Sequence, residues 1–360
     1  MEARHSCLSY TSATFDPMYR RILAVGLLWS LPISLSAQTH KGSLFTAIAF
    51  YNLENFFNPA DNPDTDDEDF TTTGSHRYTE EVFRQKTGNM ACVLSQLGTD
   101  LCPEGASVIG VCEVEDDYVL KSLVSHPLLS GRHYRFIRFD GPDKRGINVA
   151  LIYRPDAFRM LQARNVPVDL RPAGGGFTRD ILWVTGILRG DTVHLLVNHW
   201  PSRSGGEAES APKRALAAAE AKQLIATISS KQPGARIILM GDLNDDPVSP
   251  SVAKVLGATS RQDKAGAALL YNPWVSFYEN GYGTLCHNDH WNLFDQILLS
   301  PAWLSTESGH WQFYKAAVFD KDFLKTRSGR YRGYPHRSYN GNRWINGYSD
   351  HFPTIVYITR

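Results

Sequence analysis

The alternation of short apolar runs with a few helical segments constrains the fold of this chain most. Nine runs of strand-like composition lie between residues 44 and 359. Only two segments, 79–97 and 211–229, show clear helical periodicity. Because strands outnumber helices and alternate with them irregularly, the pattern favours an α/β (α+β) sandwich of packed mixed sheets with outer helices. The runs are 44–51, 107–112, 134–139, 147–153, 182–188, 192–199, 236–240, 295–299 and 354–359.

The region after residue 44 carries no sign of a domain boundary. A length of 360 residues corresponds to roughly two domains of about 150 residues each. No Pro/Gly/Ser-rich linker, charge block or internal repeat divides the region, however, so we expect one large domain over 44–360. The 37 basic and 37 acidic residues balance, which argues against a protein that wraps long nucleic acids by neutralising many phosphates.

The N-terminus is typical of a secretory signal peptide over residues 1–37. Arg20 and Arg21 precede an apolar run over 22–33, and small residues follow it up to Ala37. The run is shorter than the ~20 residues that a membrane-spanning helix needs. A buried core helix is the alternative. We therefore expect an exported protein, periplasmic or extracellular, with cleavage near Ala37 and Met18 as an alternative translation start.

Cleavage would leave a net charge of −1, because residues 1–37 hold three basic and two acidic residues. Four cysteines would remain, and export permits disulfides, but the sequence does not choose among their three pairings. Cys112 lies in an apolar run and is expected to be a buried thiol. No cysteine lies directly after the cleavage region, so we expect no stable membrane anchor. The four cysteines are Cys92, Cys102, Cys112 and Cys286.

Several of the apolar runs end in a cluster of polar side chains, and the tail of the chain repeats such clusters twice. A single strand-end Asp or Asn is usually a turn former, and a single His is usually structural. Six such clusters in one chain are poorly explained by turns. Carboxylate and amide oxygens suit Mg²⁺ or Mn²⁺, and histidines suit proton transfer. The clusters centre on Asn52 and Glu54, on Glu113, on His199, on Asp242 and Asn244, on Asp295, and on Asp350 and His351.

The ordered motifs resemble the endonuclease/exonuclease/phosphatase superfamily of metal-dependent phosphoesterases, in particular its exported bacterial members. The resemblance spans residues 50–353 and implies a four-layer sandwich, in which helices flank two packed mixed β-sheets. It rests on Asn52-Leu53-Glu54, the glutamate of Cys112-Glu113-Val114-Glu115, Asn198-His199-Trp200-Pro201, Gly241-Asp242-Leu243-Asn244, Asp295 and Ser349-Asp350-His351.

The resemblance also implies roles for these residues. Glu113 would be the principal ligand of a Mg²⁺ ion, with Asn52, Glu54 and Asp350 nearby. Many relatives carry aspartate where this chain has Glu54, so Glu54 would bind through water or position a neighbour. Mn²⁺ is an alternative ion, and Ca²⁺ is less favoured. Asp242 and Asn244 would orient the phosphate and the attacking water, or hold a second metal.

Two histidines would handle protons. His351, backed by Asp295, matches the family's His–Asp pair. His199 occupies the position of a second histidine, the general acid for the leaving oxygen in nuclease-like members, where a carboxylate supports it. Asp140 is the candidate for that support here.

Arginines and charged segments add weaker candidates. Arg145 and Arg203 are suitable phosphate clamps, because a guanidinium can hold two oxygens at once; solvated loop arginines are the alternative. The acidic segment 61–69 lacks the glycine and the distal glutamate of an EF-hand, so we interpret it as a solvated loop rather than a Ca²⁺ site. The Tyr/Arg-rich segment 327–344 either binds substrate or is a surface loop.

The sequence therefore predicts an exported, Mg²⁺-dependent phosphodiesterase and favours a nuclease that cleaves DNA or RNA by in-line attack of water. The alternative within enzymes is a lipid or small-molecule phosphoesterase of the sphingomyelinase or inositol-phosphate kind. A catalytically inactive binding module is disfavoured, because every position that the chemistry needs is filled. The expected partner is a phosphodiester substrate, and the expected state is a monomer. No G-x-S-x-G, Walker A or H-E-x-x-H motif occurs.

Overall fold

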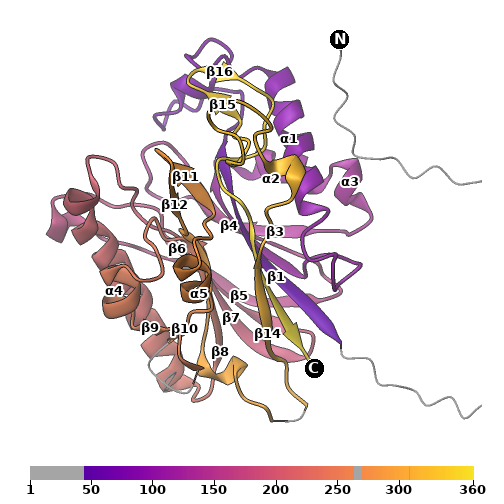
Figure 1. Ribbon diagram of the computed structural model, residues 1–360, viewed down its shortest axis with the longest axis vertical. Coiled ribbons are helices and arrows are strands. Elements are labelled where there is room, and N and C mark those ends of the chain that lie inside the picture. The colour runs from indigo at the N-terminus through magenta and orange to yellow at the C-terminus, as the bar shows by residue number, and fades with distance from the viewer. Residues whose placement is uncertain (1–43, 263–269, 308) are drawn as a thin grey trace, which may run out of the picture. The chain divides into compact units, whose positions relative to one another are not determined.

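The computed structural model describes residues 44–262, 270–307 and 309–360 (Figure 1). Leu44–Arg360 forms a compact unit. The expected signal peptide, with Met18 and Ala37, lies outside the described residues. In the part of the chain that is described, no helix is both long and apolar enough to cross a membrane.

Strand β1 (Phe45–Phe56) lies at the centre of the first sheet and is buried on both faces. Ile48 and Phe50 face the second sheet, whereas Ala49 and Tyr51 face the helices, as the period of two along a strand requires. The first sheet has six strands in the order β14 (Gln312–Val318), β17 (Thr354–Thr359), β1, β2 (Val108–Val114), β4 (Asn148–Tyr153) and β3 (Arg135–Arg138).

The second sheet has seven strands and packs face to face on the first through a shared apolar core. Strands β7 and β8 are parallel, and the other neighbouring pairs in the sheet are antiparallel except β9 with β10. The order is β5 (Phe158–Val166), β6 (Ile181–Leu188), β7 (Asp191–His199), β8 (Arg236–Asp242), β13 (Asp295–Leu299), β10 (Leu270–Tyr271) and β9 (Ala258–Thr259).

Helices cover the outer face of each sheet, which completes the four layers (Figure 1). Helices α1 (Glu80–Leu94), α2 (Asp117–Val124) and α3 (Pro127–Ser130) pack on the first sheet. Helix α4 (Glu207–Lys231) and the π-helical turn η3 (Ser251–Leu256) pack on the second. The expected mixed sandwich with two sheets and outer helices is therefore confirmed. The structure also contains one short helix and two small hairpins. These are helix α5 (Trp274–Glu279), the hairpin β11–β12 (Leu285–His287, His290–Asn292) and the hairpin β15–β16 (Tyr339–Asn340, Arg343–Trp344).

All nine expected runs form strands, but two longer strands and several of two or three residues were not expected from the sequence. Strands β5 and β14 lie at the edges of their sheets. The residues of β5 are mostly exposed, and those of β14 are half-buried or exposed. Such strands carry too little of the apolar pattern on which a sequence-based assignment depends.

The cysteines give no evidence of a disulfide framework. Cys112 is a buried thiol in β2, as its apolar surroundings predict. Within the described residues, Cys102, Cys112 and Cys286 form no disulfide. The first sheet and its helices are therefore held by apolar packing rather than by these thiols.

Gly110 in β2 allows the two sheets to approach each other closely. A Cβ atom at Gly110 would lie 2.5 Å from Met240 Sδ on the second sheet and 3.1 Å from the Phe50 ring. We predict that Gly110→Ala lowers the free energy of unfolding by about 1–3 kcal/mol, because a well-packed core does not accept an added methyl group. Urea denaturation measures this, with Gly131→Ala as the control, since a Cβ there meets no atom within 4 Å. Equal midpoints for Gly110→Ala and the wild type would contradict the prediction.

Candidate active site

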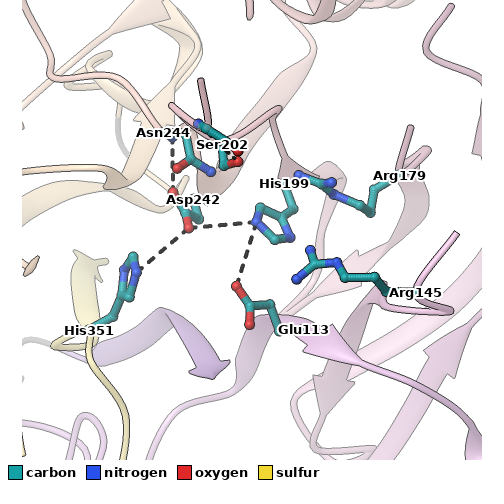
Figure 2. Close-up of a pocket in the computed structure, with 9 residues that line it drawn as sticks. Glu113, Arg145, Arg179, His199, Ser202, Asp242, Asn244 and His351 are labelled. Carbon is teal, nitrogen blue, oxygen red and sulfur yellow. Dashed lines mark hydrogen bonds and ion pairs between the residues drawn. The ribbon is translucent and has the colours of Figure 1, made fainter. Parts of the chain in front are cut away.

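Two crossover connections bring the polar ends of four strands to one edge of the sandwich. Strands β1 and β2 are parallel, and so are β7 and β8. Strand β13 runs antiparallel to β8, with Asp295 opposite Asp242, so its start meets the end of β8. A pocket of about 450 Å³ opens there (Figure 2). It is lined by Glu113, Arg145, Arg179, His199, Ser202, Ser204, Asp242, Asn244 and His351.

The Asn52 amide joins the first sheet to the second. Its Nδ2 donates to Glu113 Oε1 and to Asp242 Oδ2, at 3.0 Å in each case. Its Oδ1 accepts from the Glu54 backbone N–H at 2.8 Å. Glu113 Oε2 also accepts from the Asn55 backbone N–H at 2.8 Å. These bonds fix the position of the Glu113 carboxylate at the pocket.

The backbone at this edge is strained. Glu54, Asn55, Glu113 and Asn244 all have φ between 48° and 60°. This left-handed region is uncommon for residues other than glycine and persists where the surroundings impose it. The hydrogen bonds of Asn52 and Asn55 supply that constraint around Glu113. Strain held by a polar network is typical of a functional site.

The carboxylates at the pocket fit a divalent cation. Glu113 Oε1 and Asp242 Oδ2 each lie 3.8 Å from His199 Nε2. Among the residues that the structure describes, no Lys or Arg lies within 4.0 Å of either carboxylate. Neighbouring carboxylates that no Lys or Arg neutralises are costly, and oxygen donors suit a hard cation such as Mg²⁺ or Mn²⁺. The family-based choice of Glu113 as a ligand is compatible with this donor set.

His351 is held in a charged state. Its Nδ1 lies 2.6 Å from Asp295 Oδ2, and its Nε2 lies 3.9 Å from Asp242 Oδ2. Burial opposes protonation of the ring, but the charges of Asp295 and Asp242 outweigh it and raise the His351 pKa well above its usual value. The structure thus brings together the expected His351–Asp295 pair, with the imidazolium facing the pocket.

His199 has the opposite electrostatic environment. Burial, with the positive charges of Arg179 and Arg145, lowers its pKa well below the usual value. Its Nδ1 atom has no hydrogen-bond partner among the described residues. His199 is therefore a neutral imidazole whose Nε2 lies near Glu113 and Asp242. A neutral ring can donate or accept a hydrogen bond, but it does not supply the proton of a cationic acid.

The expected support of His199 by Asp140 does not form. The Asp140 side chain is 91% exposed, and its Oδ1 accepts from Arg138 Nη1 at 2.7 Å. Arg138 itself is buried against Asp117 on α2. Strand β3 ends at Arg138, one residue earlier than expected, and the ion pair holds Asp140 at the surface.

Asp242 and Asn244 are positioned by the turn after β8. Asp242 Oδ1 accepts from the Asn244 backbone N–H at 2.9 Å, and Asn244 Nδ2 donates to the Trp200 carbonyl at 3.0 Å. Burial raises the pKa of Asp242 to about 7; the Asp295 charge adds to this, while His351 opposes it. Asp242 and Asn244 therefore stand beside His199 and His351 in the lining of the pocket.

Arg145 lines the pocket, and the structure adds Arg179 to it. Arg179 Nη1 lies 2.9 Å from Asp143 Oδ2, and Arg145 Nε lies 3.7 Å from Asp143 Oδ1. Arg179 Nη2 also donates to the Trp200 carbonyl at 2.7 Å. Figure 2 shows both guanidinium groups beside His199. Two arginines sharing one aspartate leave a net positive charge for an anionic substrate.

The candidate residues were chosen from polar clusters at the carboxyl ends of apolar runs. Arg179 does not lie in such a cluster, so it was missed. It lies just before β6, and β6 runs antiparallel to β7. The start of β6 therefore meets the end of β7, where His199 lies. Ser202 and Ser204 were missed because isolated loop serines carry no pattern.

The predicted phosphate clamp Arg203 does not line the pocket. Its Nη2 lies 3.2 Å from Asp245 and 3.1 Å from Asp246, and its Nε donates to the Asn244 carbonyl at 3.0 Å. These contacts tie Arg203 to the turn that carries Asn244. Arg203 is therefore a contact of that turn and not a residue of the pocket lining.

Glu54 and Asp350 also lie outside the pocket lining. Glu54 Oε2 accepts from the Ser338 backbone N–H at 2.6 Å, and its Oε1 lies 3.5 Å from Arg337 Nε. Asp350 Oδ2 lies 3.2 Å from Arg337 Nη2. Burial lowers the pKa of the neighbouring Lys86 to about 8 and raises that of Glu54 to about 7. This group links β1 to the segment 327–344.

A carboxylate site for a divalent cation, beside one charged and one neutral histidine and two pocket arginines, defines a metal-dependent hydrolase of phosphoric esters. The chain belongs to the endonuclease/exonuclease/phosphatase family, whose model matches residues 47–360. No curated protein matches this chain significantly.

Solved structures share the fold at low identity. An endonuclease/exonuclease/phosphatase family protein from Bacteroides thetaiotaomicron is 16% identical, with a TM-score of 0.52 over 88% of this chain and 98% of its own. A mannosyl-6-phosphatase of that species is also 16% identical, with a TM-score of 0.52 over 87% and 99%. Truncated Caenorhabditis elegans TDP2 is 14% identical, with a TM-score of 0.53 over 88% and 98%.

Proposed function

We propose that this protein is a Mg²⁺-dependent phosphodiesterase that cleaves DNA or RNA. The observation that carries the proposal is the meeting of the Glu113 and Asp242 carboxylates with the His351–Asp295 pair in one pocket. The fold is also that of Danio rerio TDP2, whose structure was determined with a single-strand DNA product, at 15% identity and a TM-score of 0.50 over 87% of this chain and 98% of that one.

Glu113 would hold the cation, with the Asn52 amide and Asp242 at its side. When bound, a divalent cation draws charge from a phosphate oxygen and offsets the charge that develops during in-line displacement. Mg²⁺ is proposed over Mn²⁺ and Ca²⁺ because a compact set of carboxylate oxygens suits a small, hard ion.

The remaining steps belong to side chains of this chain. Asp242 orients the attacking water and accepts its proton, since a base works best with a pKa near the working pH. The His351 imidazolium supplies positive charge and a proton donor at Nε2. Neutral His199 positions a phosphoryl oxygen by a hydrogen bond from Nε2. Arg145 and Arg179 bind the phosphate oxygens that face away from the carboxylates.

A phosphomonoesterase is a second candidate. Two arginines at one pocket, which share Asp143 as their acidic partner among the described residues, suit the double negative charge of a terminal phosphate. A mannosyl-6-phosphatase shares the fold. Lipid and other small phosphoesters remain alternatives of the same chemistry, because fold alone does not define the substrate.

A substrate panel tests the proposal. Supercoiled and linear DNA, RNA, sphingomyelin, bis-nitrophenyl phosphate and mannose-6-phosphate are incubated with Mg²⁺, Mn²⁺ or Ca²⁺, with EDTA as the control. The proposal expects the highest kcat/KM for a nucleic acid with Mg²⁺. Hydrolysis of sphingomyelin or a sugar phosphate without hydrolysis of any nucleic acid would replace it with the corresponding alternative.

We predict that Arg179→Ala reduces kcat/KM by about 10–100-fold, mainly through KM, because a charged hydrogen bond contributes about 1.5–3 kcal/mol. Steady-state kinetics on a nucleic acid and on a terminal phosphate measure the effect. Arg84→Ala is the control, because Arg84 is exposed on α1 and pairs only with Glu81 among the described residues. Unchanged KM values on both substrates would remove Arg179 from the binding site.

We also propose that the protein is exported. The support is the basic pair Arg20 and Arg21, the short apolar run 22–33 and the small residues that follow. N-terminal sequencing of protein recovered from the periplasm or the medium tests this, with a mature start close to residue 38 as the expected result. Recovery of an unprocessed chain in the cytoplasm would overturn the proposal.

A further inference from the structure

The acidic segment 61–69 contains one buried carboxylate that the catalytic pocket does not use. Six of its nine residues are acidic. Five of these are exposed, but Asp67 is only 1% exposed. Its Oδ1 atom has no hydrogen-bond partner within the described part of the chain. Asp67 therefore points into the protein with an unsatisfied oxygen, which a solvated loop does not explain.

A second buried carboxylate faces Asp67. Glu115, at the end of β2, is 4% exposed and lies at hydrogen-bonding distance from the Asp67 side chain. The Asn58 backbone N–H donates to Glu115 Oε2 at 2.7 Å, and the Asn62 N–H donates to Asp67 Oδ2 at 3.2 Å. No described Lys, Arg or His forms an ion pair with Asp67 or Glu115 within 4.0 Å; the nearby Arg138 donates to the Glu115 backbone carbonyl instead.

Two buried carboxyl groups that face each other cannot both remain charged without a cation between them. The buried Tyr78 hydroxyl, which lies close enough to feel the Glu115 charge, also has no hydrogen-bond partner among the described residues. The unsatisfied atoms at this place are all oxygens, which are the donors that Ca²⁺ takes in irregular loops.

We propose that Asp67 and Glu115 bind a structural divalent cation of the Ca²⁺ type, separate from the catalytic ion. The two carboxylates lie 48 positions apart in the sequence, so an EF-hand spacing search does not find them. The Glu113 carboxylate accepts bonds from Asn52 and Asn55, whereas that of Glu115 accepts from Asn58. The Glu113 and Glu115 carboxylates are thus held by different hydrogen-bond donors, so the two sites are separate.

The cation would fasten two loops together. The Asp66 N–H donates to the Lys144 carbonyl at 2.7 Å. A Cβ at Gly146 would lie 2.9 Å from the Thr65 side chain, so the loops also touch there. The second loop carries Arg145 of the catalytic pocket. Binding at Asp67 and Glu115 therefore stabilises the segment against which the Arg145 loop packs.

Thermal unfolding of the full chain tests this without using activity. The protein carries Glu113→Gln, which weakens cation binding at the catalytic pocket, and is stripped of metal before CaCl₂ is added. We expect Tm to rise by about 5 °C when Ca²⁺ exceeds its Kd about 100-fold, because a ligand of the folded state stabilises it. A Tm that does not respond to Ca²⁺ would overturn the proposal.

Two variants identify the site. Asp67→Asn and Glu115→Gln should each abolish the Ca²⁺-dependent rise in Tm. Both should fold, because an amide N–H can donate to the remaining carboxylate as a shared proton would. Asp64→Asn, an exposed residue of the same segment, is the matched control and should keep the response.

These measurements distinguish a cation bound between Asp67 and Glu115 from a proton shared by the two side chains. A site that holds only a shared proton gives a Tm that changes with pH and not with Ca²⁺, which would overturn the proposal. A Ca²⁺ response in Asp67→Asn equal to that of its parent would also overturn it. Calorimetric titration should count one Ca²⁺ site fewer in Asp67→Asn than in the parent protein.

Discussion

Glu113→Gln is expected to reduce Mg²⁺-dependent phosphoester hydrolysis by about 10³-fold or more, because it removes the anionic ligand and with it the charge stabilisation of the displacement. The Glu113 side chain accepts two hydrogen bonds, from Asn52 and Asn55, and glutamine has one acceptor oxygen. The variant should therefore fold with a modest loss of stability, and the loss of activity should far exceed it.

Steady-state kinetics with saturating Mg²⁺ measure this effect, and a thermal melt confirms that the variant is folded. Glu68→Gln is the matched control, because Glu68 is an exposed glutamate of the same charge outside the pocket. It should keep wild-type activity. A folded Glu113→Gln protein within about tenfold of wild type would show that Glu113 does not hold the catalytic ion.

Asp295→Asn is expected to lower kcat by about 10²–10⁴-fold and to change its pH dependence. Burial disfavours the His351 cation, and the Asp295 charge is the main force that overcomes this and raises the pKa. In the wild type the imidazolium therefore persists well above the usual His pKa. Without the Asp295 charge the pKa falls, so the alkaline decline in activity should move to lower pH.

A pH profile of kcat for wild type and Asp295→Asn checks this shift. A role confined to packing would lower the rate equally at all pH values, whereas loss of the cation gives a larger deficit at high pH. His194→Gln is a suitable control, because His194 is buried and bonded to Gln232 away from the pocket. An alkaline limb that stays in place in Asp295→Asn would contradict the assignment of His351 as a cation.

Much of the fold could be predicted from the sequence because its central strands are continuous apolar runs with polar ends. Glu113 and Asp242 were chosen as strand-end residues, and the parallel pairs β1–β2 and β7–β8 bring such ends to one edge. Strand β5 was missed because an edge strand with a mostly exposed surface has no such pattern.

The missed and misplaced site residues depend on antiparallel pairing and on local charge. Arg179 precedes its strand, so only the pairing of β6 with β7 reveals its position. Asp140 follows a predicted strand, as Glu113 does, but it forms an ion pair with Arg138, two residues earlier, and stays at the surface. Asp67 was read as solvated because its partner, Glu115, lies beyond α1 in the sequence. A sequence pattern does not show which of two neighbouring charges a side chain pairs with. It also does not show which distant strands lie side by side.

The most direct test of the central claim is the rate of single-stranded DNA hydrolysis by metal-stripped protein as Mg²⁺ is returned, with wild type and Glu113→Gln measured in parallel. The account predicts no hydrolysis in EDTA, saturable recovery with Mg²⁺ in the wild type, and no recovery in Glu113→Gln. Hydrolysis that persists in EDTA, or that returns equally in both proteins, would contradict it.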